Sequence, residues 1–149
     1  MAEISLSVDV EASAAQTWAA AVDWPTQGEW MFLTRVEATS GDGHAVGDEL
    51  AAYTGLGPLR FLDTMVITAY DAPRRCVVRH TGRVVRGTAA FEVIDVGAGR
   101  SRFVWSEWLE LPLGFIGELG FALLRPLVLL PLRSSLAKFA AHAAARPAP

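Results

Sequence analysis

The chain has 149 residues, the length of one ordinary domain, so residues 1–149 are expected to fold as a single domain. Apolar residues make up 52% of the chain and charged residues 19%, which excludes a disordered segment. The net charge of −3 argues against a dedicated nucleic-acid binder, because such proteins usually carry a basic surplus.

The first predicted elements are a strand and a helix. Apolar and polar residues alternate over 3–11, which indicates a half-buried strand. Ser13 and Gln16 form a capping box, in which Ser13 accepts from the Gln16 amide and the Gln16 side chain reaches back. The N-terminal segment lacks the pattern of a secretory signal. With Cys76 as the only cysteine, we expect no disulfide and a cytoplasmic protein.

The middle of the chain predicts strands and turns. Strands are expected at 33–39, 46–54, 59–70, 75–81, 84–95 and 101–110, separated by short links rich in Gly, Pro and Asp. Short links between consecutive strands indicate antiparallel pairing. A long helix follows from about 113 to 144, and Pro126 or Pro131 could bend it. This order predicts an α+β fold.

Strand alternation predicts which side chains face inward. A two-residue turn at Gly82 and Arg83 would place Arg79 opposite Arg86. The core face of this hairpin would then hold apolar side chains and His80, with the arginines on the outer face. The same alternation turns Phe61, Asp63, Met65 and Ile67 inward on 59–70, and Phe103, Trp105 and Glu107 inward on 101–110.

Three ionisable residues therefore lie on apolar faces: Asp63, His80 and Glu107. Burying an unpaired charge is costly, so each needs a partner, a solvated rim or a ligand. They could pair structurally, serve as polar handles in a ligand cavity, or act as catalytic groups. No motif for a metal, nucleotide or other cofactor is found, and none is expected. The arginines between 74 and 86 are expected to form a solvated outer face.

Residues 113–132 are long and apolar enough to span a bilayer. Glu118 and Arg125 lie inside this stretch, and each charge near a bilayer centre costs about 2.5–3.5 kcal/mol on insertion scales. The preferred interpretation is therefore a helix buried by its own domain, without an integral membrane span.

The chain resembles the START-like superfamily called SRPBCC, which includes polyketide cyclase/dehydrase and lipid-transport proteins. The resemblance rests on the opening ASAAQTWAAAVDW and GEW, on VGDEL, on MVITAYDAPRRCVVRHTG, and on FEVIDVGAGRSRFVWSEWLELP before the final helix. It covers roughly residues 3–142. It implies a helix-grip fold, in which a curved antiparallel sheet of about seven strands wraps around a long C-terminal helix and encloses a cavity.

The sequence and this resemblance favour binding or transport of a hydrophobic small molecule, such as a lipid, polyketide or other aromatic compound. The alternatives are a polyketide cyclase or aromatase, with His80, Asp63 and Glu107 as acid and base, and a module that docks on a protein or membrane. The protein is expected to be a monomer or homodimer. The candidate ligand-binding residues are Trp30, Phe61, Asp63, Met65, His80, Phe91, Trp105, Glu107, Phe115, Leu119 and Leu123.

Overall fold

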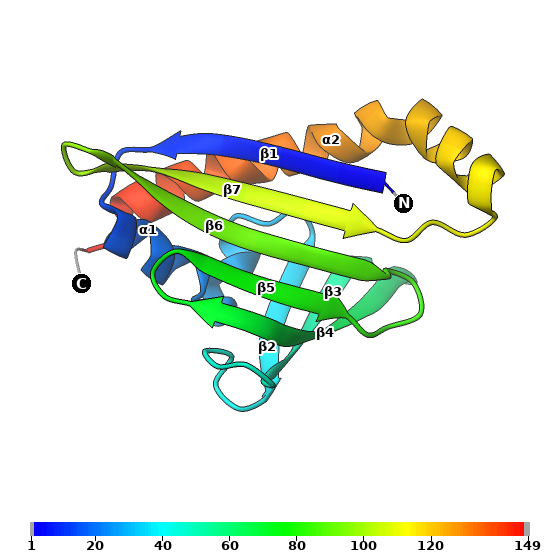
Figure 1. Ribbon diagram of the computed structural model, residues 1–149, viewed down its shortest axis with the longest axis horizontal. Coiled ribbons are helices and arrows are strands. Elements are labelled where there is room, and N and C mark those ends of the chain that lie inside the picture. Colours follow the sequence, from blue (N-terminus) through cyan, green and yellow to red (C-terminus); the bar gives the residue numbers. More distant parts are fainter. Residues whose placement is uncertain (1, 148–149) are drawn as a thin grey trace.

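The computed structural model describes residues 2–147 and shows a strongly twisted sheet with a long helix along one side (Figure 1). In these residues the sheet has seven antiparallel strands in the order β1-β7-β6-β5-β4-β3-β2. The predicted α+β helix-grip fold is confirmed. The strands are β1 (Ala2–Val10), β2 (Thr34–Ser40), β3 (Glu49–Leu56), β4 (Leu59–Asp71), β5 (Arg75–His80), β6 (Gly87–Gly97) and β7 (Arg100–Leu109).

Three helical elements complete the described chain: α1 (Ala14–Ala21), the 3-10 helix η1 (Trp24–Glu29) and α2 (Gly114–Ala145). Ser13 caps α1 as predicted and accepts a hydrogen bond from the Gln16 amide at 3.2 Å. The prediction for the Gln16 side chain was wrong. Its side-chain Nε2 instead donates to the backbone carbonyls of Ala143 and Arg146, at 3.0 and 2.7 Å. Because the last carbonyls of a helix lack partners, Gln16 fastens the end of α2 to α1.

The connection between β5 and β6 differs from the prediction. Residues 81–86 form a loop, and Arg79 pairs with Thr88 rather than Arg86. Gly87 starts β6 at a φ of +116°, where a side chain would meet the backbone of β7. The register is therefore two residues away from the two-residue turn that was predicted. A shift of two keeps each side chain on its face, so the predicted inward residues were correct.

The second half of α2 closes the core against the sheet. Leu136, Phe139 and Ala143 are buried there. The Phe139 ring lies 4.2 Å from that of Phe103 and 4.8 Å from that of Trp30, measured between ring centroids. Buried aromatic rings contribute much of a small core's apolar area, so this cluster fixes the distance between helix and sheet.

The first half of α2 is exposed, so the prediction that this domain buries the helix was wrong here. Figure 1 shows the first turns curving away from the line of the second half, and Pro126 and Pro131 lie inside the helix. Arg125 ties it to β1 by donating to the Glu3 carbonyl at 3.2 Å. Eight large apolar residues here are 53–78% exposed: Leu113, Phe115, Ile116, Leu119, Leu123, Leu124, Leu127 and Leu130.

By length and composition alone, α2 could cross a membrane, and its most apolar window is not buried. This is weak evidence for a span, because core helices of non-membrane proteins pass the same test. In the second half, Leu136, Phe139 and Ala143 are buried against the sheet, as expected for a helix of this fold.

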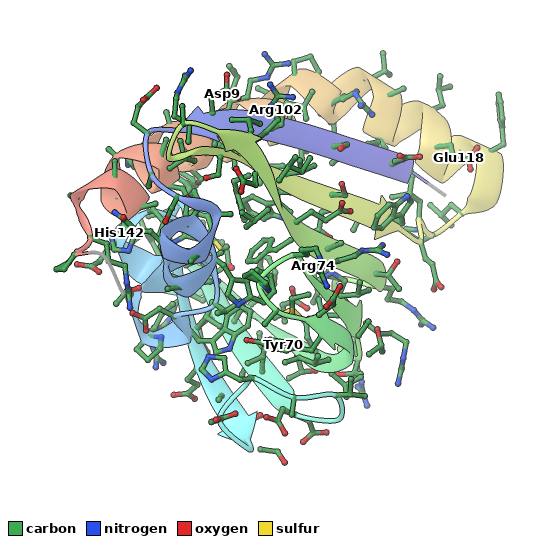
Figure 2. All side chains as sticks on the ribbon, turned by 60° about the vertical axis from the view of Figure 1, so that its left-hand side comes forward. Asp9, Tyr70, Arg74, Arg102, Glu118 and His142 are labelled. Atoms are coloured by element: carbon green, nitrogen blue, oxygen red, sulfur yellow. The ribbon has the colours of Figure 1, made fainter. Side chains whose placement is uncertain are left out.

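The outer face of the sheet carries paired charges. Figure 2 shows Asp9 and Arg102 side by side on neighbouring strands, with 2.9 Å between carboxylate and guanidinium. Exposed pairs of this kind contribute at most about 1 kcal/mol each, so they balance charge more than they stabilise the fold. The expected solvated basic face is confirmed, because all five arginines between 74 and 86 are exposed. Three of them pair with acids: Arg74 with Asp71, Arg75 with Glu92, and Arg86 with Glu110.

Candidate functional site

A pocket of about 500 Å³ lies between the inner face of the sheet, η1 with the loop after it, and the middle of α2. Most of its wall is apolar. Phe32 and Phe61 line it and are also 50% and 37% exposed to solvent. From α2 the wall takes Val128, Pro131, Leu132 and Ser135.

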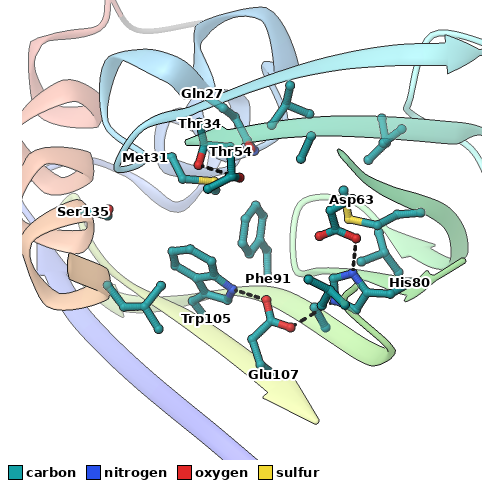
Figure 3. Close-up of a pocket in the computed structure, with 18 of the residues that line it drawn as sticks. Gln27, Met31, Thr34, Thr54, Asp63, His80, Phe91, Trp105, Glu107 and Ser135 are labelled. Carbon is teal, nitrogen blue, oxygen red and sulfur yellow. Dashed lines mark hydrogen bonds and ion pairs between the residues drawn. The ribbon is translucent and has the colours of Figure 1, made fainter. Parts of the chain in front are cut away.

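Three charged residues meet at one end of this pocket, as Figure 3 shows. His80 Nδ1 lies 2.8 Å from Asp63 Oδ1, and His80 Nε2 lies 3.1 Å from Glu107 Oε2. All three side chains are largely buried, with 3%, 13% and 16% exposed for His80, Asp63 and Glu107. The sequence placed these residues on inward faces, and the structure brings them together as one cluster.

Small residues on β6 make this cluster possible. His80 on β5 and Glu107 on β7 are separated by β6, so two strand spacings, roughly 10 Å, divide their backbones. On β6, Gly87 pairs with His80 and Ala89 pairs with Glu107. Because neither Gly87 nor Ala89 has a large side chain, the His80 imidazole and the Glu107 carboxylate can meet over the inner face of β6. Asp63 reaches His80 from β4, where the next inward residue, Met65, pairs with His80.

The geometry of the cluster sets its protonation. An ionised carboxylate only accepts hydrogen bonds, and a neutral imidazole has only one donor nitrogen. Both ring nitrogens of His80 face carboxylates, which favours the imidazolium form. Burial lowers the pKa of His80, but hydrogen bonds to Asp63 and Glu107, together with their charges, outweigh it and raise the pKa to about 9. At neutral pH this raised pKa favours the imidazolium form of His80.

The carboxylates differ in their remaining contacts. Trp105 Nε1 donates to Glu107 Oε1 at 3.0 Å, so both oxygens of Glu107 are engaged. Among the described residues, the one side-chain partner of Asp63 is His80, which contacts Oδ1, and no donor reaches Oδ2. Asp63 thus keeps one acceptor oxygen available at the pocket.

The opposite part of the pocket holds neutral polar residues that sequence reasoning missed. Thr34 and Thr54 bond each other at 3.1 Å, Gln27 donates to the Ala21 carbonyl, and Ser135 accepts from the Phe32 amide. Alternation along β3 could have identified Thr54, which follows the inward residues Leu50 and Ala52. Gln27 and Ser135 have no such signal, because only tertiary packing turns them toward the pocket.

The predicted ligand-binding residues fall into three groups. Trp30 is buried behind the pocket, in ring contact with Phe91 and Trp105. Phe115, Leu119 and Leu123 lie outside the lining on the exposed half of α2, because the helix approaches the pocket only from Val128 onward. The part of α2 that lines the pocket therefore lies further along the helix than the predicted residues. The residues that do line the pocket are Phe61, Asp63, Met65, His80, Phe91, Trp105 and Glu107.

Within residues 2–147, no group of three or more His, Cys, Asp or Glu side chains could hold a metal ion. Cys76 lines the pocket, and burial raises the pKa of its thiol to about 12. A thiol that stays protonated is neither a good ligand nor a nucleophile at neutral pH. The charged cluster offers hydrogen bonding and proton transfer at one end of the pocket.

Comparison with known families gives a match over nearly the whole chain. A family model described as polyketide cyclase / dehydrase and lipid transport matches residues 1–144. The chain belongs to this family. The resemblance noted in the sequence is thereby confirmed. A comparison with curated proteins gave no match.

Solved structures share the fold at low sequence identity. The Zhui aromatase/cyclase of a Streptomyces species has a TM-score of 0.77 at 14% identity, with 95% of this chain and 93% of that chain covered. A Thermus thermophilus protein scores 0.77 at 13% identity and covers 95% and 97%. Norcoclaurine synthase of Thalictrum flavum, in complex with dopamine and hydroxybenzaldehyde, scores 0.70 at 17% identity and covers 99% and 89%. At these identities the similarity shows the fold alone.

Proposed function

We propose that this protein binds a hydrophobic small molecule, such as a lipid, polyketide or other aromatic compound, in the pocket between the sheet and α2. One observation carries the proposal: the pocket is apolar, has a volume of about 500 Å³, and has charge at one end only. Ligand sites are typically apolar clefts of about 300–1,000 Å³ with a few polar groups. Membership of a family that includes lipid transport supports a carrier role.

Binding of Nile red, a neutral apolar dye, tests this proposal. Ala52 lines the pocket from β3, so Ala52→Phe should fill part of it and abolish the rise in dye fluorescence. The control is Leu123→Gln with Leu127→Gln on exposed α2, because the dye could also adhere there. The proposal predicts that the pocket variant loses the signal and the helix variant keeps it. The opposite pattern would place dye binding on α2 and refute the proposal.

A second candidate is a cyclase-type enzyme in the same pocket. It is favoured by His80, a charged imidazole held between two carboxylates beside an apolar cavity. Near neutral pH this ring could give a proton to a substrate, and Asp63 could accept one. His80→Gln separates the candidates. If the protein is a carrier, the variant should still bind one ligand per chain, with altered affinity. If it is an enzyme, the variant should still bind the substrate but lose turnover.

The third expectation, an interaction module, remains a prediction. The surface it would use is the exposed apolar face of α2 that includes Phe115, Leu119 and Leu123. The helix variant of the dye experiment would then weaken docking on a protein or membrane and leave pocket binding intact.

A further inference from the structure

We propose that the Asp63–His80–Glu107 cluster makes the pocket select ligands that end in a neutral or cationic hydrogen-bond donor, such as a hydroxyl or ammonium group, and disfavour ligands that end in a carboxylate. This inference rests on the proposed function, because it concerns the ligand of the same pocket. It follows from the charge of the cluster and from the one oxygen left unused.

The charge of the cluster is the same in either arrangement of its protons. An imidazolium between two carboxylates has a net charge of −1. A neutral imidazole between one carboxylate and one carboxylic acid also has a net charge of −1. Both states satisfy the hydrogen bonds at the two ring nitrogens. This end of the pocket is therefore negative wherever the shared proton resides.

The rest of the lining does not neutralise that charge. No lysine or arginine lines the described pocket. Both nitrogens of His80 are already engaged by carboxylates, and the Trp105 N–H is engaged by Glu107, so none of them offers a ready donor to an incoming anion. On the outer face of the sheet, Arg75 and Arg102 pair with Glu92 and Asp9, and neither arginine lines the pocket.

Asp63 Oδ2 supplies the attractive part of the selectivity. It is an acceptor with no donor among the described residues, on a carboxylate that is 13% exposed and lines the pocket. A hydroxyl or ammonium group at this place would donate to a charged acceptor, which is among the stronger hydrogen bonds in proteins. A carboxylate at this place would meet a like charge in a partly desolvated site.

Three probes that share one ring system test the inference: 2-naphthol, 2-naphthylmethylamine and 2-naphthoate. Calorimetric titration at neutral pH should give Kd values for the alcohol and the amine about tenfold or more below that of the carboxylate. Asp63→Asn removes one negative charge and keeps an oxygen that can accept from His80, so the penalty for naphthoate should shrink severalfold. Asp9→Asn makes the same change on the exposed outer face and should leave the ratio unchanged.

Glu107→Gln is a second variant in case Asp63→Asn does not fold, and it should shrink the same penalty. Wild-type binding of naphthoate as tight as that of naphthol would overturn the selectivity and leave the pocket standing. A ratio that none of the pocket variants alters would also overturn it. If no probe binds the wild type and Nile red does not bind either, the proposed function itself fails and this inference falls with it.

Discussion

Removal of the His80 imidazole should change how the stability of the protein depends on pH. The folded-state pKa of about 9 lies above the usual value of 6.5, so folding strengthens proton binding at this ring. The stabilisation is fully present below pH 6.5 and is lost as pH rises through about 9. One pKa unit corresponds to about 1.4 kcal/mol, so this shift is worth on the order of 3 kcal/mol. The side chain is 3% exposed, so little screening by solvent is expected.

Urea unfolding of the wild type and of His80→Gln between pH 6.5 and pH 10 measures this effect. Groups common to both proteins cancel in the difference between their free energies of unfolding. That difference should fall by on the order of 3 kcal/mol across this range. NMR titration of the imidazole in the folded protein gives the pKa directly. A constant difference, with an imidazole that titrates near 6.5, would refute the charged cluster described for the pocket.

Three other predictions test the packing. In urea unfolding, Phe139→Ala should lower the free energy of unfolding by about 3–5 kcal/mol, because its ring is buried. Leu123→Ala should change it by less than about 1 kcal/mol, because that side chain is exposed. Similar losses for the two variants would contradict an exposed first half of α2. The Cys76 thiol should resist a disulfide reagent at pH 8 until urea unfolds the protein, because burial raises its pKa to about 12. Gly87→Ala should destabilise by more than about 1 kcal/mol, because a side chain there meets the backbone of β7, whereas Gly120→Ala enters open space in a helix and should be neutral or stabilising.

Strand alternation made the inward faces predictable from the sequence. On β4 and β7 the period of two placed Asp63 and Glu107 inside without knowledge of the exact register. The β5–β6 hairpin shows why this works: its pairing is two residues away from the predicted one, yet His80 still faces inward. The direct contact between the three residues was not predictable, because it depends on a register that places Gly87 and Ala89, which lack large side chains, beside His80 and Glu107.

Helix α2 was less predictable. Its first and second halves are both apolar, so composition cannot tell which half packs against the sheet. The structure buries Leu136 and Phe139 and leaves Leu119 and Leu123 exposed. This division depends on the path of the helix across the sheet, which is a tertiary feature. The part of α2 that lines the pocket consequently begins at Val128, beyond Phe115, Leu119 and Leu123, which were expected to line it.

The central claim is that the pocket holds a hydrophobic small molecule, and native mass spectrometry of the purified protein tests it most directly. The account predicts a reproducible added mass that denaturing extraction releases as a lipid or aromatic compound, or that appears after incubation with such compounds. Ala52→Phe should lose this mass, because its side chain fills the pocket. A bare protein mass under all conditions, with no thermal shift across a panel of lipids and polyketide-like aromatics, would contradict the account.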